Sequence, residues 1–353
     1  PSHLNHKGNR VPVLVQEQGI GRGDDITDNA FVNGIVNLTL GASVGDDYTS
    51  YKVVPQYISS KSNAFFLKNY EYSEFDFTKN NQIQIELYAG KLEGNLIYAE
   101  NPYQAIEEYT SYCGRMQPLP AWIVSGAIIG MQGGTAKLYD IWQKMKNADV
   151  PVIAFWTQDW IGQRTTLAGK QLWWNWELDN DRYPNWNLLH DSLSSNSISL
   201  MGYINPFLVD VTAEKSNYRR DMYKEATQNN YLVLNDAGQP YQVQNTSFTS
   251  GVLDLSDTGC VHWIKDIIKD EMLARGQKGW MADFAEALPF DVELHSGEST
   301  ATFHNKYPEV WVKINKEAIN ESNLKDTVVF FSRAGYTKSP KYATLFWQGD
   351  QLV

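Results

Sequence analysis

The chain has 353 residues, of which 42% are hydrophobic and 20% charged, and its formal net charge at pH 7 is −11. This length exceeds one small domain, and the composition is that of a globular protein with no apolar run long enough to cross a membrane. The acidic balance argues against a phosphate-binding surface, so no nucleic-acid partner is expected, and the lack of a long apolar run means that no membrane partner is expected.

Residues 1–118 contain short alternating runs at 52–57, 63–67 and 82–88, separated by clusters of Asn, Ser, Gly and Lys. Alternation of this kind is typical of antiparallel strands with one buried face. The segment is therefore expected to be the C-terminal part of an N-terminal β-sandwich domain. A proline-rich stretch at 117–121 marks the junction with the next domain.

Residues 119–353 change to a rhythm of strand, helix and strand. Amphipathic helices are expected at 261–273 and 303–319, where apolar residues recur on one face. Alternating β and α units predict a parallel sheet, open or closed. The expected buried strands are 126–131, 152–156, 199–205, 251–255, 279–284, 327–332 and 343–347.

The residues that follow these strands favour a closed barrel over an open sheet. Many of the strands end in a polar or charged residue, as an enzyme barrel requires when it gathers its active site at the C-terminal ends of its strands. The glycine-rich stretch 130–134 lacks the spacing of a dinucleotide-binding turn. The expected fold class is α/β, a (β/α)8 TIM-type barrel that is incomplete in this chain. The polar strand ends are Gln158, Asp159, Asn205, Asp283, Arg333 and Asp350.

Two carboxylates stand out among these strand ends, Asp283 and Asp350. Retaining glycosidases flank the scissile bond with two carboxyl groups about 5–5.5 Å apart, one ionised and one protonated. Each Asp is equally compatible with capping a following helix or turn. The 12 Trp and 20 Tyr suit a sugar-binding site, although an aromatic-rich core explains them equally well.

The segments Trp280-Met-Ala-Asp-Phe-Ala-Glu-Ala-Leu-Pro289 and Trp347-Gln-Gly-Asp-Gln351 resemble the nucleophile and acid/base segments of glycoside hydrolase family 31, and most closely its sulfoquinovosidases. The resemblance covers nearly the whole chain. Further matching segments are Glu17–Arg22, Leu119–Trp122, Gln132–Gly134, Trp156–Trp160, Trp174–Trp176, Tyr203–Pro206 and Ser332–Gly335.

The resemblance implies a retaining α-glycosidase that needs no cofactor and no metal. It places the nucleophile at Asp283 and the acid/base at Asp350, and it makes Asp159 and Arg333 the residues that hold the sugar ring. Gln132, Gln158 and Trp174 match positions at which sulfoquinovosidases recognise their substrate. Trp347 is expected to form an apolar wall together with Trp156 and Trp174.

Two positions depart from the family pattern. Sulfoquinovosidases place an arginine against the sulfonate where this chain has Gln171, which offers neutral N–H donors and no charge. Ala285 stands where relatives usually carry glycine, so the turn behind Asp283 is expected to differ. Glu286, in the same turn, is interpreted as a support for it or as a solvated surface carboxylate.

Several expectations remain open. A non-catalytic carbohydrate-binding or structural glycoprotein and a transglycosylase share the residues of the hydrolase. The expected partner is a carbohydrate, and a homo-oligomer is compatible with the sequence. Sequons at Asn37, Asn245 and Asn320 lean weakly towards a secreted glycoprotein. Family members extend beyond both ends of this segment, so the intact protein is expected to have about twice this length; a complete native mass near 40 kDa would contradict that.

Overall fold

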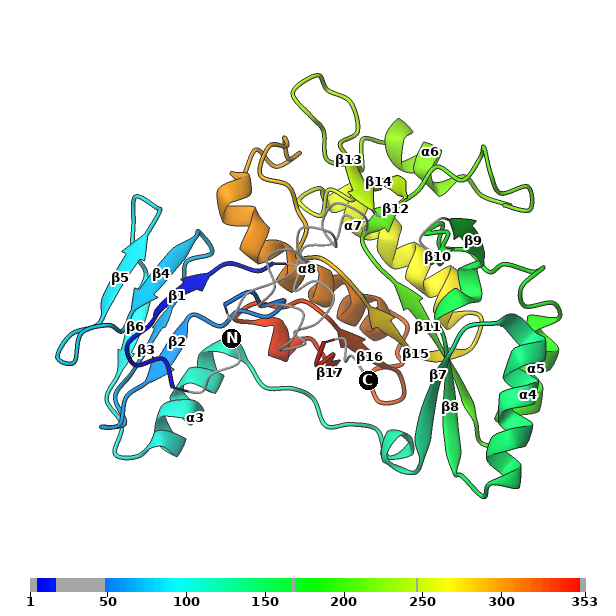
Figure 1. The fold of residues 1–353 in the computed structure, drawn as a ribbon, viewed down its shortest axis with the longest axis horizontal. Helices are drawn as coiled ribbons and strands as arrows, with labels where there is room; N and C mark the ends of the chain where they lie inside the picture. The colour runs from blue at the N-terminus through cyan, green and yellow to red at the C-terminus, as the bar shows by residue number, and fades with distance from the viewer. Residues whose placement is uncertain (1–4, 17–47, 167–168, 246, 350–353) are drawn as a thin grey trace, which may run out of the picture.

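The computed structural model describes residues 5–16, 48–166, 169–245 and 247–349. The N-terminal part consists of small antiparallel sheets and one helix, and the larger part that follows is built around a parallel sheet (Figure 1). Among the described residues, no helix combines the length and the apolarity that crossing a membrane requires. The elements of the N-terminal part are β1 (Arg10–Val13), β2 (Gln56–Ile58), β3 (Ala64–Leu67), β4 (Ser73–Asp76), β5 (Gln84–Leu87), β6 (Gly94–Ile97) and α3 (Pro102–Cys113).

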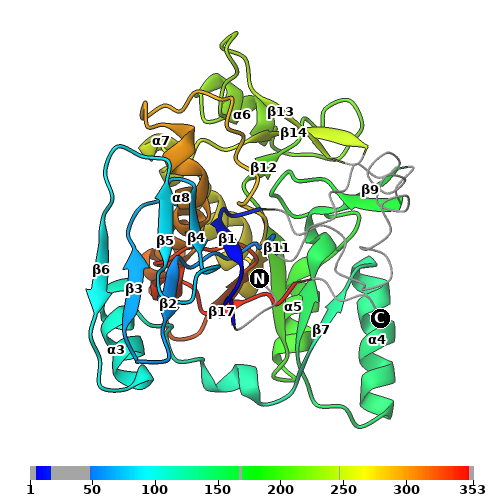
Figure 2. The same cartoon turned by 60° about the vertical axis from the view of Figure 1, so that its left-hand side comes forward.

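The N-terminal strands form two three-stranded sheets, in the orders β1-β4-β5 and β2-β3-β6, and every pairing is antiparallel. The sheets lie side by side (Figure 2) and meet through aromatic rings, with the Phe65 and Phe75 centroids 6.2 Å apart. The expected sandwich is thus supported in part, by two small antiparallel sheets in contact. Helix α3 was not expected; Asn101 caps it by accepting from the Gln104 amide, and Pro102 occupies its first turn.

The larger part carries the remaining elements. Its six-stranded sheet has the order β17-β16-β15-β11-β8-β7, and all of its pairings are parallel. The strands are β7 (Ala127–Met131), β8 (Val152–Thr157), β9 (Gln163–Thr166), β10 (Gly169–Leu172), β11 (Ser199–Ile204), β12 (Phe207–Leu208), β13 (Gln242–Asn245), β14 (Phe248–Val252), β15 (Gln277–Ala282), β16 (Val329–Ser332) and β17 (Leu345–Phe346). The helices are α4 (Gly134–Asn147), α5 (Trp186–Ser194), α6 (Met222–Gln228), α7 (Thr258–Ile267) and α8 (Thr300–Glu321).

The strand order explains why this sheet belongs to a barrel. Each strand of the sheet pairs with the next one along the chain, whereas a doubly wound sheet reverses direction at a switch point. The sheet is also curled. Trp156 of β8 contacts Phe331 of β16 and Trp347 after β17, with centroids 5.0 Å and 5.9 Å apart, although β11 and β15 separate these strands in the sheet. Side chains from distant strands therefore meet on its concave side.

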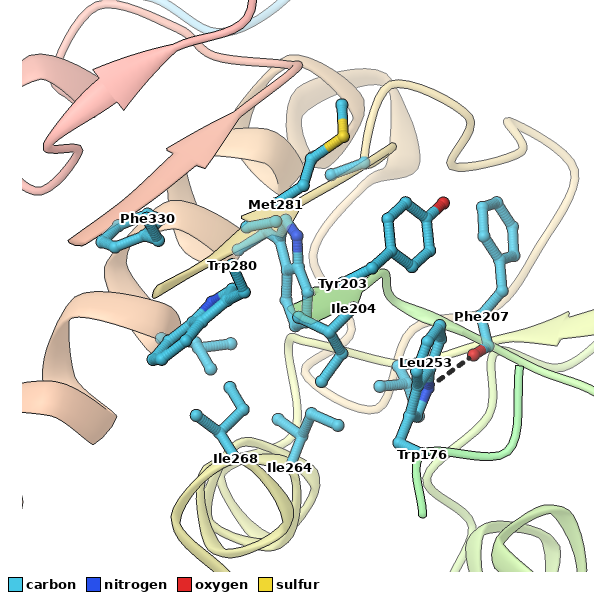
Figure 3. Close-up of a cluster of buried hydrophobic side chains, with 14 of the residues drawn as sticks. Trp176, Tyr203, Ile204, Phe207, Leu253, Ile264, Ile268, Trp280, Met281 and Phe330 are labelled. Atoms are coloured by element: carbon cyan, nitrogen blue, oxygen red, sulfur yellow. Dashed lines mark hydrogen bonds between the residues drawn. The ribbon is translucent and has the colours of Figure 1, made fainter. Parts of the chain in front are cut away.

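Helices cover the outer face of the sheet, with α4 and α5 outside β7 and β8 (Figure 1). Asp257 caps helix α7 by accepting from the Gly259 amide. Ile264 of α7 and Ile268, the first residue of the π-helical turn that continues it, lie beneath Trp280 of β15 (Figure 3). The Trp280 indole N–H donates to Asn315 of α8 at 2.8 Å, so the one polar atom of this ring is satisfied in the core. The expected helices at 261–273 and 303–319 are confirmed in α7, its π-helical extension Ile268–Leu273, and α8.

One expected barrel strand is wrong. Residues 251–255 do not join the parallel sheet; strand β14 ends at Val252 and pairs with β12 and β13 in a separate antiparallel sheet. The run is buried. A short apolar run has the same sequence pattern in a parallel core strand and in a covered antiparallel strand, so burial alone did not identify its sheet. The other expected strands correspond to β7, β8, β11, β15, β16 and β17.

Helix α8 joins the two parts of the molecule. Asn305 accepts from the Val15 amide at 2.8 Å and donates to the carbonyls of Val13 and Tyr70, at 3.2 and 2.8 Å. His304, also buried, lies 2.8 Å from the Val15 carbonyl. The N-terminal strands are therefore seated on the same helix that supports β15 from behind.

Candidate active site

The residues singled out from the sequence directly follow strands of the parallel sheet. Gln132 follows β7, Gln158 and Asp159 follow β8, Asp283 follows β15, and Arg333 follows β16. Because parallel strands share a direction, these side chains start from one edge of the sheet. Trp347 follows β17 at the same edge. Asp350, the expected acid/base, lies outside the described residues, as do residues 17–22 and Asn37.

Asp283 is held in a buried, polar setting, with a relative exposure of 6%. The Tyr203 hydroxyl donates to its Oδ2, and the Arg333 Nε lies 3.4 Å from its Oδ1. Burial and the neighbouring carboxylate raise the pKa of Tyr203 well above its ordinary value, so this phenol stays a donor. A hydroxyl donor and a guanidinium both stabilise the ionised form of a carboxyl group, which is the form that attacks carbon.

Arg333 connects Asp283 to Glu286. One guanidinium nitrogen contacts the Glu286 Oε1, and Glu286 is only 2% exposed, which excludes the surface alternative for this residue. The guanidinium lies over the rings of Phe284 and Tyr51, 3.9 Å and 4.7 Å from their centroids. A planar cation between two rings and two carboxylates is restricted in every direction. We call Tyr203, Asp283, Glu286 and Arg333 the Asp283 cluster.

The turn after Asp283 runs through left-handed backbone. Phe284 has a φ of 55° and Ala285 a φ of 84°. The sequence predicted that alanine would alter this turn. In the structure, Ala285 itself adopts the positive φ. Ala285 is 1% exposed, so its methyl group is packed. A non-glycine residue in this region is strained by roughly 1 kcal/mol or more.

Aromatic rings wall the site on two sides. Trp174 is 7% exposed and stacks on Phe207 with centroids 5.3 Å apart, and it meets Phe284 and Phe248 edge-on. Trp347 and Trp156 form an edge-to-face pair on the concave side of the sheet. That these rings present apolar surfaces to a sugar stays a prediction.

Asp159 is fully enclosed by protein donors. Its Oδ1 accepts from the Tyr183 hydroxyl at 2.6 Å, and its Oδ2 accepts from the Gly133 amide and the Arg182 Nε, each at 2.7 Å. The residue is 0% exposed. A carboxylate saturated in this way holds its neighbours in place, and the neighbour that faces outward is Arg182, whose side chain is 26% exposed.

Gln132 and Gln158 belong to a chain of amides that the sequence did not indicate. The Gln132 Nε2 donates to the Gln158 Oε1 at 2.5 Å, the Gln163 Nε2 donates to the Gln132 Oε1, and the Arg182 Nη2 donates to the Gln163 Oε1 at 2.7 Å. We call these three glutamines and Arg182 the amide chain. Gln163 begins the short strand β9 and Arg182 lies in a loop, and no motif in the sequence points to either residue.

Gln171 lies on the β9–β10 hairpin, where it is the register partner of Arg164. Its Oε1 accepts from the Ser247 hydroxyl at 2.7 Å, and the Thr166 hydroxyl lies 3.0 Å away. Arg164 is 7% exposed and lies over the Phe248 ring, 3.8 Å from its centroid, and burial lowers the pKa of its guanidinium. The amide oxygen of Gln171 is thus turned towards hydroxyl donors.

The N-terminal part also reaches the C-terminal edge of the sheet. Tyr51 lies under Arg333, as described above, and the Lys52 Nζ donates to the Trp347 carbonyl. Burial lowers the pKa of Lys52 to about 8, so its charge is lost above that pH. Within the described ranges, no group of three His, Cys, Asp or Glu side chains has an arrangement that would hold a metal ion.

Comparison with known proteins gives concordant matches. Residues 117–352 match the family model described as the glycosyl hydrolases family 31 TIM-barrel domain. The chain is 34% identical over 352 residues to a sulfoquinovosidase of Escherichia coli and 30% identical over 354 residues to one of Agrobacterium fabrum. The match covers 100% of this chain but 50% and 51% of those proteins, so the chain spans about half the length of the curated relatives it matches.

Solved structures agree in fold. The structure of a sulfoquinovosidase from E. rectale, in complex with an aza-sugar inhibitor, superposes with a TM-score of 0.91 at 33% identity, covering 99% of this chain and 51% of that one. A Flavobacterium johnsoniae dextranase, at 19% identity and a TM-score of 0.78, shares the fold. The chain belongs to glycosyl hydrolases family 31 and contains strands of its TIM-barrel domain.

Proposed function

We propose that the intact protein is a retaining α-glycosidase that hydrolyses an α-glycoside through a covalent glycosyl-enzyme, with Asp283 as the nucleophile. The observation that carries the proposal is the setting of Asp283: a strand-end carboxylate beside one hydroxyl donor and one guanidinium, at the edge of the sheet where barrel enzymes act. Its relatives named sulfoquinovosidases support the same reaction class.

In this mechanism the aglycone leaves as Asp350 protonates the glycosidic oxygen, while Asp283 attacks the anomeric carbon from the opposite face. Water activated by Asp350, now acting as the base, then releases the sugar with its α configuration retained. Arg333 pairs with Asp283 before attack and is retained by Glu286 when the carboxylate becomes an ester. The role of Asp350 is assigned from its position in the sequence after a predicted strand and from the family resemblance.

The substrate proposal separates the sugar ring from its substituent. Trp174, Trp156 and Trp347 supply apolar faces for a sugar ring, and Arg333 is a donor at the edge of the site. Gln171 places a neutral amide where sulfoquinovosidases carry an arginine, so recognition of a sulfonate would need other donors. We propose a sulfoquinovosidase-like subsite whose donors are amides.

The proposal is tested with two chromogenic substrates, a p-nitrophenyl α-glucoside and a p-nitrophenyl α-sulfoquinovoside. We expect turnover of at least one, and a fall in kcat of about 10⁴-fold or more in Asp283→Asn, because loss of a nucleophile removes the covalent route. Asp149→Asn, at an exposed residue in the turn between α4 and β8, is the matched control and keeps its activity.

Three outcomes would redirect the proposal. A β sugar appearing first in NMR spectra of the reaction would show inversion and remove the covalent intermediate. Products longer than the substrate would identify a transglycosylase. Tight sugar binding without turnover of either substrate would favour a carbohydrate-binding protein on the same fold.

A further inference from the structure

Residues 50–53 of the N-terminal part lie as a short extended segment against the chain that follows β16. Lys52 forms a parallel β-bridge with Gly335. The Gly335 amide donates to the Tyr51 carbonyl at 3.1 Å, and the Val53 amide donates to the Gly335 carbonyl at 3.2 Å. This pair of main-chain hydrogen bonds fixes the direction of the segment relative to the sheet. The N-terminal part therefore contributes backbone as well as side chains to the C-terminal edge of the parallel sheet.

The side chains of Tyr51 and Lys52 reach the ends of two different strands. Neighbouring side chains of an extended segment point to opposite sides. The Tyr51 ring lies under the guanidinium of Arg333, which follows β16. The Lys52 Nζ donates to the carbonyl of Trp347, which follows β17. Because β16 and β17 are paired in the sheet, two adjacent residues of the N-terminal part contact both strand ends.

The hydrogen bond from Lys52 completes the anchoring of the Trp347 main chain. The Trp347 amide donates to the Ser332 carbonyl at 2.8 Å, and the Trp347 carbonyl accepts from Lys52. Strand β17 is only two residues long, so few hydrogen bonds of the sheet hold this part of the chain. Two residues further on, Gly349 has a φ of 96°, in a region of backbone space that glycine enters freely. The chain beyond Trp347 consequently takes its direction from the two groups that hold this residue.

The ammonium group of Lys52 is unfavourable for folding. The side chain is half-buried, and burial lowers the pKa of the group to about 8, with no contribution from Arg333 or any other charged neighbour. Among the described residues, no carboxylate forms an ion pair with it; its Nζ contacts the Trp347 carbonyl and lies 5.1 Å from the centroid of the Phe346 ring. An unpaired cation removed from water lowers stability. A destabilising group at the edge of an active site points to a role in the reaction.

We propose that Lys52 is a positioning residue for the acid/base, because it fixes the main chain of Trp347 and thereby the segment that carries Asp350. The proposal rests on the proposed glycosidase function and deepens it by assigning a residue of the N-terminal part to the protonation step. Trp347 lies three positions before Asp350, which is at most about 10 Å along an extended chain. A misplacement of about 1 Å at a reacting group can lower a rate by about 100-fold. Lys52 acts through Trp347 and does not itself touch the substrate.

Different aglycones depend on the acid to different extents. A methoxide group leaves only when its oxygen is protonated, whereas p-nitrophenolate leaves readily without a proton because its negative charge is delocalised. A displaced acid therefore slows the cleavage of a methyl α-glycoside much more than that of a p-nitrophenyl α-glycoside of the same sugar. A residue that only supports the fold slows both reactions equally.

Lys52→Met in the intact protein tests this assignment with the methyl and p-nitrophenyl α-glycosides of the sugar that the wild type cleaves. We expect kcat/KM to fall about 30-fold for the methyl glycoside and less than about threefold for the p-nitrophenyl glycoside. Lys52→Arg keeps a cationic donor and should recover most of the activity on the methyl glycoside. Lys61→Met, which replaces an exposed lysine in the turn between β2 and β3, is the matched control and leaves both values unchanged.

The pH dependence of Lys52→Met separates positioning from folding. The loss on the methyl glycoside should narrow above pH 8, where the wild-type lysine is neutral and donates a weaker hydrogen bond. Below pH 8 the variant should unfold at a higher temperature than the wild type, because it lacks the half-buried charge. This gain in stability should decline from pH 8 to about pH 10, since the folded wild type releases its proton before the unfolded chain does.

The two proposals fail in different ways. Equal losses for the two glycosides in Lys52→Met, or no recovery with arginine, would overturn the role of Lys52 and leave the glycosidase in place. A lower unfolding temperature of Lys52→Met at pH 7, together with equal losses, would make Lys52 a purely structural residue. A wild-type protein that cleaves neither glycoside of any sugar tested would overturn the glycosidase and the role of Lys52 together.

Discussion

The Asp283 cluster and the amide chain lie at the same edge of one sheet, yet the first is built mainly from charged side chains and the second mainly from amides. The Asp283 cluster places ionic groups in a buried setting, with Asp283, Glu286 and Arg333 all less than 10% exposed. The amide chain uses three neutral side chains of partial or full exposure, and its one cation is paired with a carboxylate. Buried charges demand fixed partners, whereas amides depend on a neighbour for their direction. We therefore propose that the first region serves the reaction and that the second contributes to substrate choice.

Among the changes that test this comparison outside the nucleophile itself, the largest effect is expected from Glu286→Gln, which disrupts the ionic contacts of the Asp283 cluster. The variant keeps the shape of the side chain but removes the charge that holds Arg333, and a hydrogen bond to a charged group is worth about 1.5–3 kcal/mol. We expect kcat to fall by about 100-fold for both substrates alike. Glu298→Gln, at a half-exposed ion pair with Lys306, should leave kcat unchanged. A loss confined to one substrate would contradict the division between the two regions.

A smaller effect is expected from Tyr203→Phe, which removes the hydroxyl donor of Asp283. The loss of a donor disfavours the ionised carboxylate, so the acidic limb of the pH profile of kcat/KM should move to higher pH, with a fall of about tenfold at low pH. Tyr307→Phe removes an equally buried hydroxyl, which donates to the Leu253 carbonyl away from the site. That control should lower stability and leave the pH profile in place; an identical profile in both variants would detach Tyr203 from the reaction.

Gly134→Ala disturbs the amide chain by displacing the backbone of the loop that carries Arg182. The added Cβ would meet the Arg182 carbonyl at 2.3 Å, and the φ of 74° is unfavourable for alanine, so the Arg182 loop has to move. We expect KM for an anionic substrate to rise on the order of fivefold with kcat for the glucoside retained. Gly238→Ala, at a φ of 70° with no atom within 4 Å of its Cβ, tests the backbone strain alone.

The smallest effect is expected from Ala285→Gly, which touches the turn and neither set of contacts. Glycine tolerates the observed φ of 84°, so strain is relieved, and we expect a gain of about 0.5–1 kcal/mol in the free energy of unfolding. Thermal unfolding measures it, with Asn323→Gly, at a φ of 57° after helix α8, as a comparison site outside the active site. A loss of stability would mean that packing of the Ala285 methyl group outweighs the strain.

The barrel strands could be predicted from the sequence because each is a short apolar run that ends in a polar residue. Asp283 and Arg333 belong to this pattern, and their proximity follows from strand direction alone. Tyr203 lies within a strand, and no pattern in the sequence indicates that its hydroxyl contacts a carboxylate. Gln163 and Arg182 contact partners 19 to 31 positions away on other elements, and no local rule connects such positions. The run at 251–255 was assigned to the wrong sheet because burial does not specify the strand partner.

The contact between the N-terminal strands and helix α8 limits which substitutions this protein can accept. Asn305 and His304 contact the segment at Val13 and Val15 through main-chain groups only. These hydrogen bonds do not depend on the side chains of that segment, but Val13 and Val15 are buried in the core and require apolar replacements. Asn305 itself has no equivalent substitute. A chimera that joins the N-terminal sheets of one relative to the barrel of another should fold if the first keeps apolar residues at the positions of Val13 and Val15 and the second brings an asparagine at the position of Asn305.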